Sequence, residues 1–151
     1  TGVMRGRFHQ ASGQRFCCGL YGWSGSRTRP GGFYRVRYVG GEVAMPTGMR
    51  SVPGGLELQF GSKLEAAIAV DAGSYSVKTW SLRRSRNYGS KHYDVKDLEV
   101  AAAALSADGK VVRLRIADLQ PTMCLEVTCD LETASGDDLR AKIHGTLHKV
   151  R

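Results

Sequence analysis

The feature that most restricts the fold of this chain is a strict alternation of apolar and polar residues in short segments. In Leu56–Phe60 (LELQF), residues 56, 58 and 60 are apolar and the two residues between them are polar. A period of two places alternate side chains on opposite faces of an extended strand, so the apolar set faces a core. Segments of this kind predict half-buried β-strands.

The dipeptide Asp108–Gly109 is the clearest turn signal, because apolar alternation flanks it on both sides. Asp-Gly suits the tight turns that join two antiparallel strands. We therefore expect an Ala-rich strand at Leu98–Ala107 to pair with a strand in which Val112, Leu114 and Ile116 point inward.

Further strands are expected at Ser74–Leu82, at Met123–Leu131 and at 139–147. The inward residues of the last two would be Met123, Leu125, Val127, Cys129, Leu131, Leu139, Ala141, Ile143 and Leu147. Lys63–Asp71 is rich in helix formers and predicts a short helix, with Ser62 as its N-cap. Six or seven short strands and one helix predict an all-β chain that folds as an antiparallel immunoglobulin-like β-sandwich, with a small barrel as the alternative.

The first 41 residues differ sharply in charge from the rest of the chain. They contain seven Arg and no acidic residue (+7), whereas residues 42–151 contain 22 − 7 = 15 basic and 14 acidic residues (+1). Such one-sided charge indicates contact with nucleic acid or another anionic surface, or docking against an acidic neighbouring domain.

Two strands are expected in this basic region, at Gln14–Trp23 and at Phe33–Val39, joined by a turn at Ser24–Gly32. Thr1–Gly13 lacks apolar periodicity and is expected to be an arm, while Gly40–Pro53 has the composition of a linker. We therefore expect two domains: a basic β-ribbon at 1–44 and the sandwich at 45–151.

The stretch Ser74–Asp94 (SYSVKTWSLRRSRNYGSKHYD) carries the strongest functional signal. It begins as a strand and continues into a loop rich in basic and aromatic residues, with no acidic residue from Ala72 to Tyr93. The candidate ligand-binding residues are Trp80, Arg83, Arg84, Arg86, Tyr88, Lys91, His92 and Tyr93.

Trp80 has the strand parity opposite to Tyr75 and Val77, so it would face outward if those two residues face the core. An outward Trp near Tyr and Arg side chains suits a sugar ring, whose apolar face stacks on aromatic rings while Arg groups bond its hydroxyls. The alternative is that the loop covers Trp80 as a second small core. Nucleic acid is not the expected ligand, because no recognised nucleic-acid motif accompanies the basic residues.

His144 and His148 invite a metal hypothesis, with His92 as a third ligand candidate. Residues i and i+4 of a strand lie about 13 Å apart, however, and two ligands of one ion cannot easily meet across that distance. A copper set of His92, Met123, Cys124 and a second His is a further alternative. Surface histidines without a metal remain the simpler interpretation, and we expect no cofactor.

The four cysteines do not form a disulfide scaffold at this length. Cys17 and Cys18 are adjacent, and Cys124 and Cys129 have opposite strand parity, so only a bond between the two pairs is geometrically plausible. No CxxC spacing occurs.

Nothing in the sequence indicates catalysis. There is no GxSxG elbow, and Glu57 and Asp137–Asp138 occupy positions typical of solvated acids. Asp94 and Asp97 flank the basic loop and are expected to pair with its cations. No apolar run is long enough to span a membrane, and no signal peptide is visible.

Two resemblances bear on architecture. LELQF-GSKLEAAIAVDAGSYSV, LEVAAAALSADGKVVRLRI and MCLEVTCDL resemble bacterial immunoglobulin-like domains. GLYGWSGSRTRPGGFYRVRYVGG, KTWSLRRSRNYGSKHYD and IHGTLHKV resemble the C-terminal region of large secreted planctomycete and verrucomicrobial proteins, which combine a sugar-dehydrogenase-like β-propeller, often a cytochrome c domain, and a terminal immunoglobulin-like domain. This resemblance implies that residues 1–40 correspond to the last propeller strands, and that the chain is secreted or periplasmic.

Together these features predict a non-catalytic accessory module that binds a carbohydrate or anionic polysaccharide through the basic loop. The alternatives are a structural or docking domain within a larger propeller-type redox protein, and a histidine-based metal site.

Overall fold

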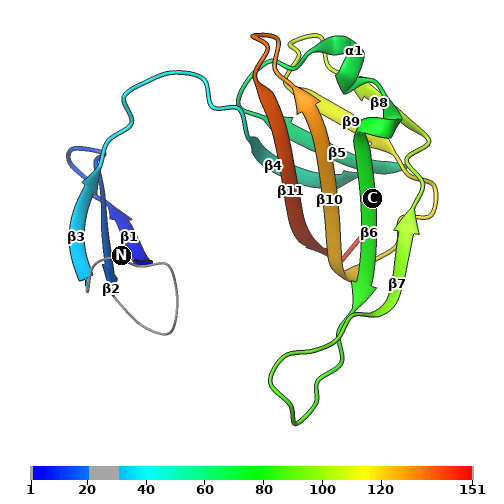
Figure 1. Cartoon of the computed structure of the whole chain (residues 1–151), viewed down its shortest axis with the longest axis horizontal. Coiled ribbons are helices and arrows are strands. Elements are labelled where there is room, and N and C mark those ends of the chain that lie inside the picture. Colours follow the sequence, from blue (N-terminus) through cyan, green and yellow to red (C-terminus); the bar gives the residue numbers. More distant parts are fainter. Residues whose placement is uncertain (1, 21–30, 151) are drawn as a thin grey trace. The chain divides into compact units, whose positions relative to one another are not determined.

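The structure is a computed structural model that describes residues 2–20 and 31–150. The chain divides into two compact units, Thr1–Gly41 and Glu42–Arg151. Each unit has its own sheets, shown in Figure 1, and each is described by itself below.

The N-terminal unit is a three-stranded antiparallel sheet in the order β1-β2-β3. Its strands are β1 (Gly2–Phe8), β2 (Arg15–Leu20) and β3 (Gly31–Val36). The expectation of an arm at Thr1–Gly13 was therefore wrong: β1 pairs with β2 along its length, so the expected two-stranded ribbon has a third strand. The predicted turn at Ser24–Gly32 and the end of the strand predicted at Gln14–Trp23 fall largely outside the described residues.

The second unit is an antiparallel β-sandwich of two four-stranded sheets, in the orders β4-β5-β9-β8 and β11-β10-β6-β7 (Figure 1). If the eight strands are lettered A, B, C, C′, D, E, F and G along the chain, these sheets are A-B-E-D and G-F-C-C′, the arrangement of immunoglobulin-like domains. The predicted all-β antiparallel sandwich is confirmed, and the barrel alternative was wrong because the two sheets stay separate. The strands are β4 (Pro46–Val52), β5 (Gly55–Phe60), β6 (Tyr75–Ser81), β7 (Tyr93–Leu98), β8 (Ala102–Leu105), β9 (Val111–Arg115), β10 (Thr122–Glu132) and β11 (Asp138–Leu147).

The inward faces of both sheets share one core. The alternation read from the sequence holds on β5 and around β9, where the predicted inward residues are buried. Strands β6, β10 and β11 supply the opposite layer of the same cluster. The core residues are Leu56, Leu58, Phe60, Leu64, Ala69, Tyr75, Val77, Val112, Leu114, Ile116, Leu119, Leu125, Val127, Cys129, Leu131, Leu139 and Leu147.

Two predicted boundaries and one predicted side-chain orientation were wrong. The linker expected at Gly40–Pro53 contains β4, which pairs with β5. The strand expected at Leu98–Ala107 is divided, because Leu98 ends β7 in one sheet whereas β8 lies in the other. Met123 was expected to face the core but is 53% exposed, because the pairing of β10 with β11 shifts register between Thr122 and Leu125.

The predicted helix is shorter than expected and begins later. Helix α1 spans Ala66–Ala69, and its N-cap is Glu65 rather than Ser62, which is buried. A 3-10 turn, η1 (Ala72–Ser74), follows at once and leads into β6. The hydroxyl of Tyr75 donates a hydrogen bond to the carbonyl of Ala69 (2.8 Å), which fixes the end of the helix to the sandwich.

The four cysteines are free thiols, and their faces agree with the predicted parity. Cys17 is buried whereas its neighbour Cys18 is exposed, and the thiol of Cys129 is buried whereas that of Cys124 is partly exposed. Burial raises the pKa of the Cys129 thiol to about 11. Among the described residues, no helix is long and apolar enough to cross a membrane.

Candidate functional site

The basic loop, residues 82–92, joins β6 to β7 and extends beyond the end of the sandwich (Figure 1). The last pair of the two strands is Ser81 with Tyr93, after a register shift that begins at Thr79. The residues between Ser81 and Tyr93 therefore leave the sheet as one long excursion rather than as a tight hairpin turn. Its side chains divide into a braced base and an open tip.

At the base, Asp94 holds the start of the loop. Its carboxylate accepts a hydrogen bond from the hydroxyl of Ser81 (2.8 Å) and lies 3.9 Å from the guanidinium of Arg83. The same guanidinium lies over the ring of Tyr93, 4.4 Å from its centroid, in a cation–π contact. Asp94 also has a positive φ of 52°, an uncommon backbone conformation for a residue other than glycine.

This geometry confirms the expectation that Asp94 pairs with a cation of the loop. Asp97 pairs instead with Lys78 of β6 (3.5 Å) and takes no part in the loop. Two of the predicted binding residues, Arg83 and Tyr93, thus contact each other at the base.

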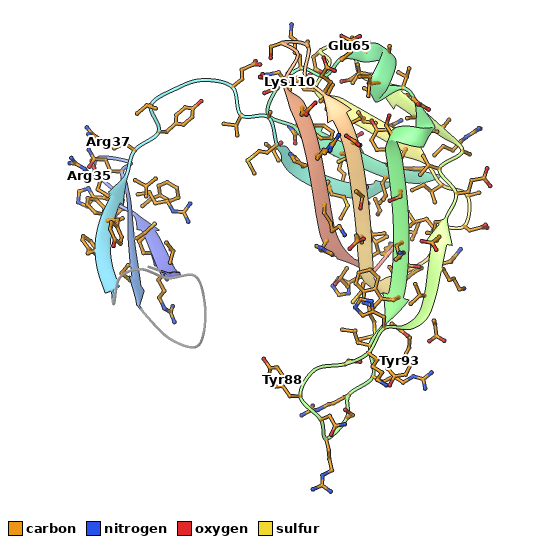
Figure 2. The ribbon with its side chains drawn as sticks, in the orientation of Figure 1. Arg35, Arg37, Glu65, Tyr88, Tyr93 and Lys110 are labelled. Carbon is orange, nitrogen blue, oxygen red and sulfur yellow. The ribbon has the colours of Figure 1, made fainter. Side chains whose placement is uncertain are left out.

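The tip presents the remaining basic side chains to solvent. Arg84, Arg86 and Lys91 are exposed, and within residues 31–150 their side chains form neither an ion pair nor a hydrogen bond. Tyr88 is fully exposed, and Figure 2 shows its side chain extending away from the loop while Tyr93 lies at the base. The loop thus carries three cations without ion-pair partners in residues 31–150, which can attract an anionic ligand, and one exposed aromatic ring, on which such a ligand can stack.

Trp80 lies on the outer face of its sheet, as the parity argument predicted, but it is only 8% exposed. It is absent from the cluster of core side chains between the sheets. The ring of His92 stacks on the indole, with centroids 4.4 Å apart and planes 18° apart, and His144 of β11 meets it edge-on at 6.4 Å. The expected exposed platform was therefore wrong, and the alternative, in which the loop covers Trp80, is confirmed: the loop folds back at its C-terminal end and places His92 on the indole.

Two of the candidate metal ligands, His92 and His144, contact Trp80 instead of forming a shared ligand set. His92 is stacked on the indole, and the Nε2 atom of His144 is 3.8 Å from the carboxylate of Glu126. Searching residues 2–20 and 31–150 finds no group of three His, Cys, Asp or Glu side chains placed to hold an ion. The proposed set that adds Met123, Cys124 or His148 gains no support from this geometry.

Glu57 was expected to be a solvated acid, and this was wrong. Its side chain is only 13% exposed and lies between Arg50 (2.5 Å) and Arg113 (3.3 Å) on the outer face of the β4-β5-β9-β8 sheet. The hydrogen bond from Arg50, reinforced by Arg113, holds the pKa of this carboxyl below its ordinary value. An ionised carboxylate between two guanidinium groups braces three strands and is poorly suited to accept a proton.

Sequence reasoning missed a cavity of about 260 Å³ beneath the base of the loop. Asp94 and Lys96 line it from one side, and the β9–β10 connection supplies Asp118 and Gln120 from the other. Sequence reasoning also missed Ser90, whose hydroxyl accepts a hydrogen bond from the backbone N–H of Arg83 (3.0 Å). No local sequence pattern indicates this brace, because the two residues are seven positions apart.

Comparisons of this chain with protein-family models, curated proteins and solved structures gave no match.

Proposed function

We propose that this chain is a non-catalytic binding module, and that the tip of the basic loop binds an anionic polysaccharide. The observation that carries the proposal is the combination of three unpaired cations with the fully exposed Tyr88 on one projecting loop. The carboxylate of Asp94 pairs with Arg83 and Ser81 at the base of the loop, so it does not neutralise the cations of the tip.

A sugar polymer fits this surface better than a simple anion does. The guanidinium groups of Arg84 and Arg86 can bond carboxylates and hydroxyls in pairs, while the ring of Tyr88 offers a face for the apolar side of a pyranose. A long loop also gives room for several sugar units along a chain. Secretion or export to the periplasm would place the module where such polymers occur.

The test compares binding of polygalacturonate with binding of neutral dextran, using the whole chain. We expect the acidic polymer to bind and its affinity to fall with added salt, because exposed charges are screened. The double variant Arg84→Ala/Arg86→Ala should weaken binding about two- to thirtyfold, since each exposed ionic contact is worth about 0.2–1 kcal/mol.

Arg140→Ala is the control for the single variant Arg84→Ala, because each removes one exposed arginine and Arg140 lies on β11, which does not adjoin the loop's strands, and pairs with Asp130 (3.0 Å). Equal loss of affinity in both variants would show that general charge, and not the loop, is responsible. Tighter binding of a single-stranded oligonucleotide than of polygalacturonate would instead assign the loop to nucleic acid.

A second proposal, docking to an acidic neighbouring protein domain, is supported by the N-terminal sheet. Its strands carry exposed apolar side chains, among them Phe8 (70% exposed) and Phe33 (73%), within a region of seven Arg and no acid. Three strands with uncovered apolar surface lack an adequate core of their own. Amide hydrogen exchange in β1 and β2 of the isolated chain should be faster than in β10 of the sandwich, and equal protection of these strands would contradict this second role.

A further inference from the structure

Trp80 occupies an unusual position, because it is buried without belonging to the core of the sandwich. Its indole lies on the outer face of the β11-β10-β6-β7 sheet, directly opposite Cys124 of β10 in the strand pairing. Outer faces of immunoglobulin-like sheets are solvated, so a large ring at this position needs a separate cover.

A side chain of the basic loop lies on the flat face of the indole. The imidazole of His92 is stacked on it, nearly parallel, and His92 is itself exposed to solvent. In the described parts of the chain, this imidazole has no hydrogen bond or ion pair, so stacking alone holds it in place. His144 also meets the indole, but with the ring planes at 80° and the centroids 6.4 Å apart, so among these two histidines only His92 is stacked parallel to it.

The stack is weak enough to be exchanged for another ring. An offset-stacked aromatic pair contributes a factor of about two to ten in an equilibrium constant. His92 belongs to the same loop whose tip we assign to ligand binding, and it directly precedes Tyr93, the first residue of β7. A ligand held by the tip can therefore compete with the imidazole for the indole.

We propose that the face of Trp80 is a second, covered subsite of the basic loop, which a pyranose ring of the bound polysaccharide reaches by displacing His92. The imidazole stands in for that ring in the free protein, as a flat group of similar width on the indole face. This inference rests on the proposed polysaccharide-binding function, and it adds a specific ligand group, a sugar ring with an apolar face, and a specific displaced residue.

Polar groups for the hydroxyls of such a ring flank Trp80 on the same face of the sheet. Lys78 precedes it by two positions on β6, Glu126 follows Cys124 by two positions on β10, and His144 lies opposite Glu126 on β11. Glu126 already accepts from Lys142 (3.2 Å), which holds its carboxylate beside this surface. A stacked ring with hydroxyl partners on one side matches the amphipathic character of a pyranose.

The test uses His92→Ala in a Trp23→Phe background, so that Trp80 is the one fluorophore of its kind. Acrylamide should quench Trp80 more strongly in His92→Ala than in the parent, because the covered face becomes accessible. Polygalacturonate should bind His92→Ala about two- to tenfold more tightly, since the ligand no longer displaces the imidazole, and saturating polymer should then protect Trp80 from acrylamide.

His148→Ala is the control, because it removes a histidine that has no ring contact with Trp80 in the described structure. Unchanged or weaker binding by His92→Ala, or polymer that binds without protecting Trp80, would overturn this inference. If the parent binds polygalacturonate and loses it in Arg84→Ala/Arg86→Ala while His92→Ala has no effect, the proposed function stands and the covered subsite fails. If neither the parent nor His92→Ala binds, both proposals fail.

Discussion

Tyr75 offers a quantitative test of the packing between the short helix and the sandwich. Its side chain is buried, and its hydroxyl donates to the carbonyl of Ala69 at the end of α1. Substituting Tyr75→Phe keeps the ring but leaves that carbonyl without this donor. We expect the free energy of unfolding at pH 7 to fall by about 1–2 kcal/mol, the cost of an unsatisfied buried polar group.

The same substitution has a pH signature. Burial, helped by the nearby charges of Cys129 and Asp71, raises the pKa of the Tyr75 phenol above its ordinary value. Below pH 10 the phenol is protonated in both states, so it adds no pH dependence. Above pH 10 it ionises only in the unfolded chain, and the folded protein loses about 1.4 kcal/mol of stability by pH 11.

Tyr75→Phe has no phenol to ionise, so its deficit relative to the parent should shrink from about 1–2 kcal/mol at pH 7 to near zero at pH 11. The assay is urea unfolding at several pH values between 7 and 11, followed by far-UV circular dichroism. Tyr93→Phe, whose hydroxyl makes no hydrogen bond in the described structure, is the control and should change stability by less than about 0.5 kcal/mol. A Tyr75→Phe deficit that stays constant across this range would refute the assignment of the buried, hydrogen-bonded phenol.

Three further predictions follow from individual side chains. Gly55→Ala should lower the free energy of unfolding by about 3 kcal/mol or more, because a Cβ there would lie 1.8 Å from a backbone carbonyl oxygen of β9. Gly48→Ala faces only a flexible side chain and should lower it by less than about 1 kcal/mol, and chemical denaturation of both variants measures the difference. Glu57→Gln should lower stability at neutral pH, because the pKa of Glu57 is lower in the folded than in the unfolded chain. The loss of stability should be complete at pH values above the ordinary pKa of a Glu carboxyl and should disappear as the pH falls through the lowered pKa of the folded state; unfolding of the parent and the variant at pH 7 and in acid measures this. In single-cysteine variants, Ellman's reagent should modify Cys18 much faster than Cys17, which is buried on the other face of β2, and equal rates would contradict the described N-terminal sheet.

The sequence was most informative where alternation was strict. Leu56, Leu58, Val112 and Leu114 were assigned to the core from their spacing alone, and all four are fully buried. The Asp108–Gly109 hairpin also formed as predicted, with Gly109 at a positive φ of 72°. These features depend on residues close together in the chain, which is why a single sequence suffices to predict them.

Features set by distant partners could not be read in this way. Strand β4 lies in a segment of turn-like composition, and its pairing with β5 outweighs that local preference. The exposure of Met123 results from an irregularity in pairing with β11, which has no local signature. In both cases the pairing with another strand, and not the local sequence, determines the structure.

The candidate site shows the same division. The parity of Trp80 correctly placed it on the outer face, but its cover depends on how an eleven-residue loop returns to the sheet. The ring of His92 reaches Trp80 from the loop, and the ring of His144 reaches it from β11, which is distant in sequence. Parity gives the direction of a side chain, and only the fold gives its neighbours.

The most direct test of the central claim is a ¹⁵N-edited NMR titration of the whole chain with short oligogalacturonates. We expect the largest amide chemical-shift changes in residues 82–92, with further changes at Trp80 and its indole N–H, and little change in the β4-β5-β9-β8 sheet. Shifts confined to residues 2–20 or to the opposite sheet, or no shifts at saturating oligosaccharide, would contradict the assignment of the basic loop as a polysaccharide-binding surface.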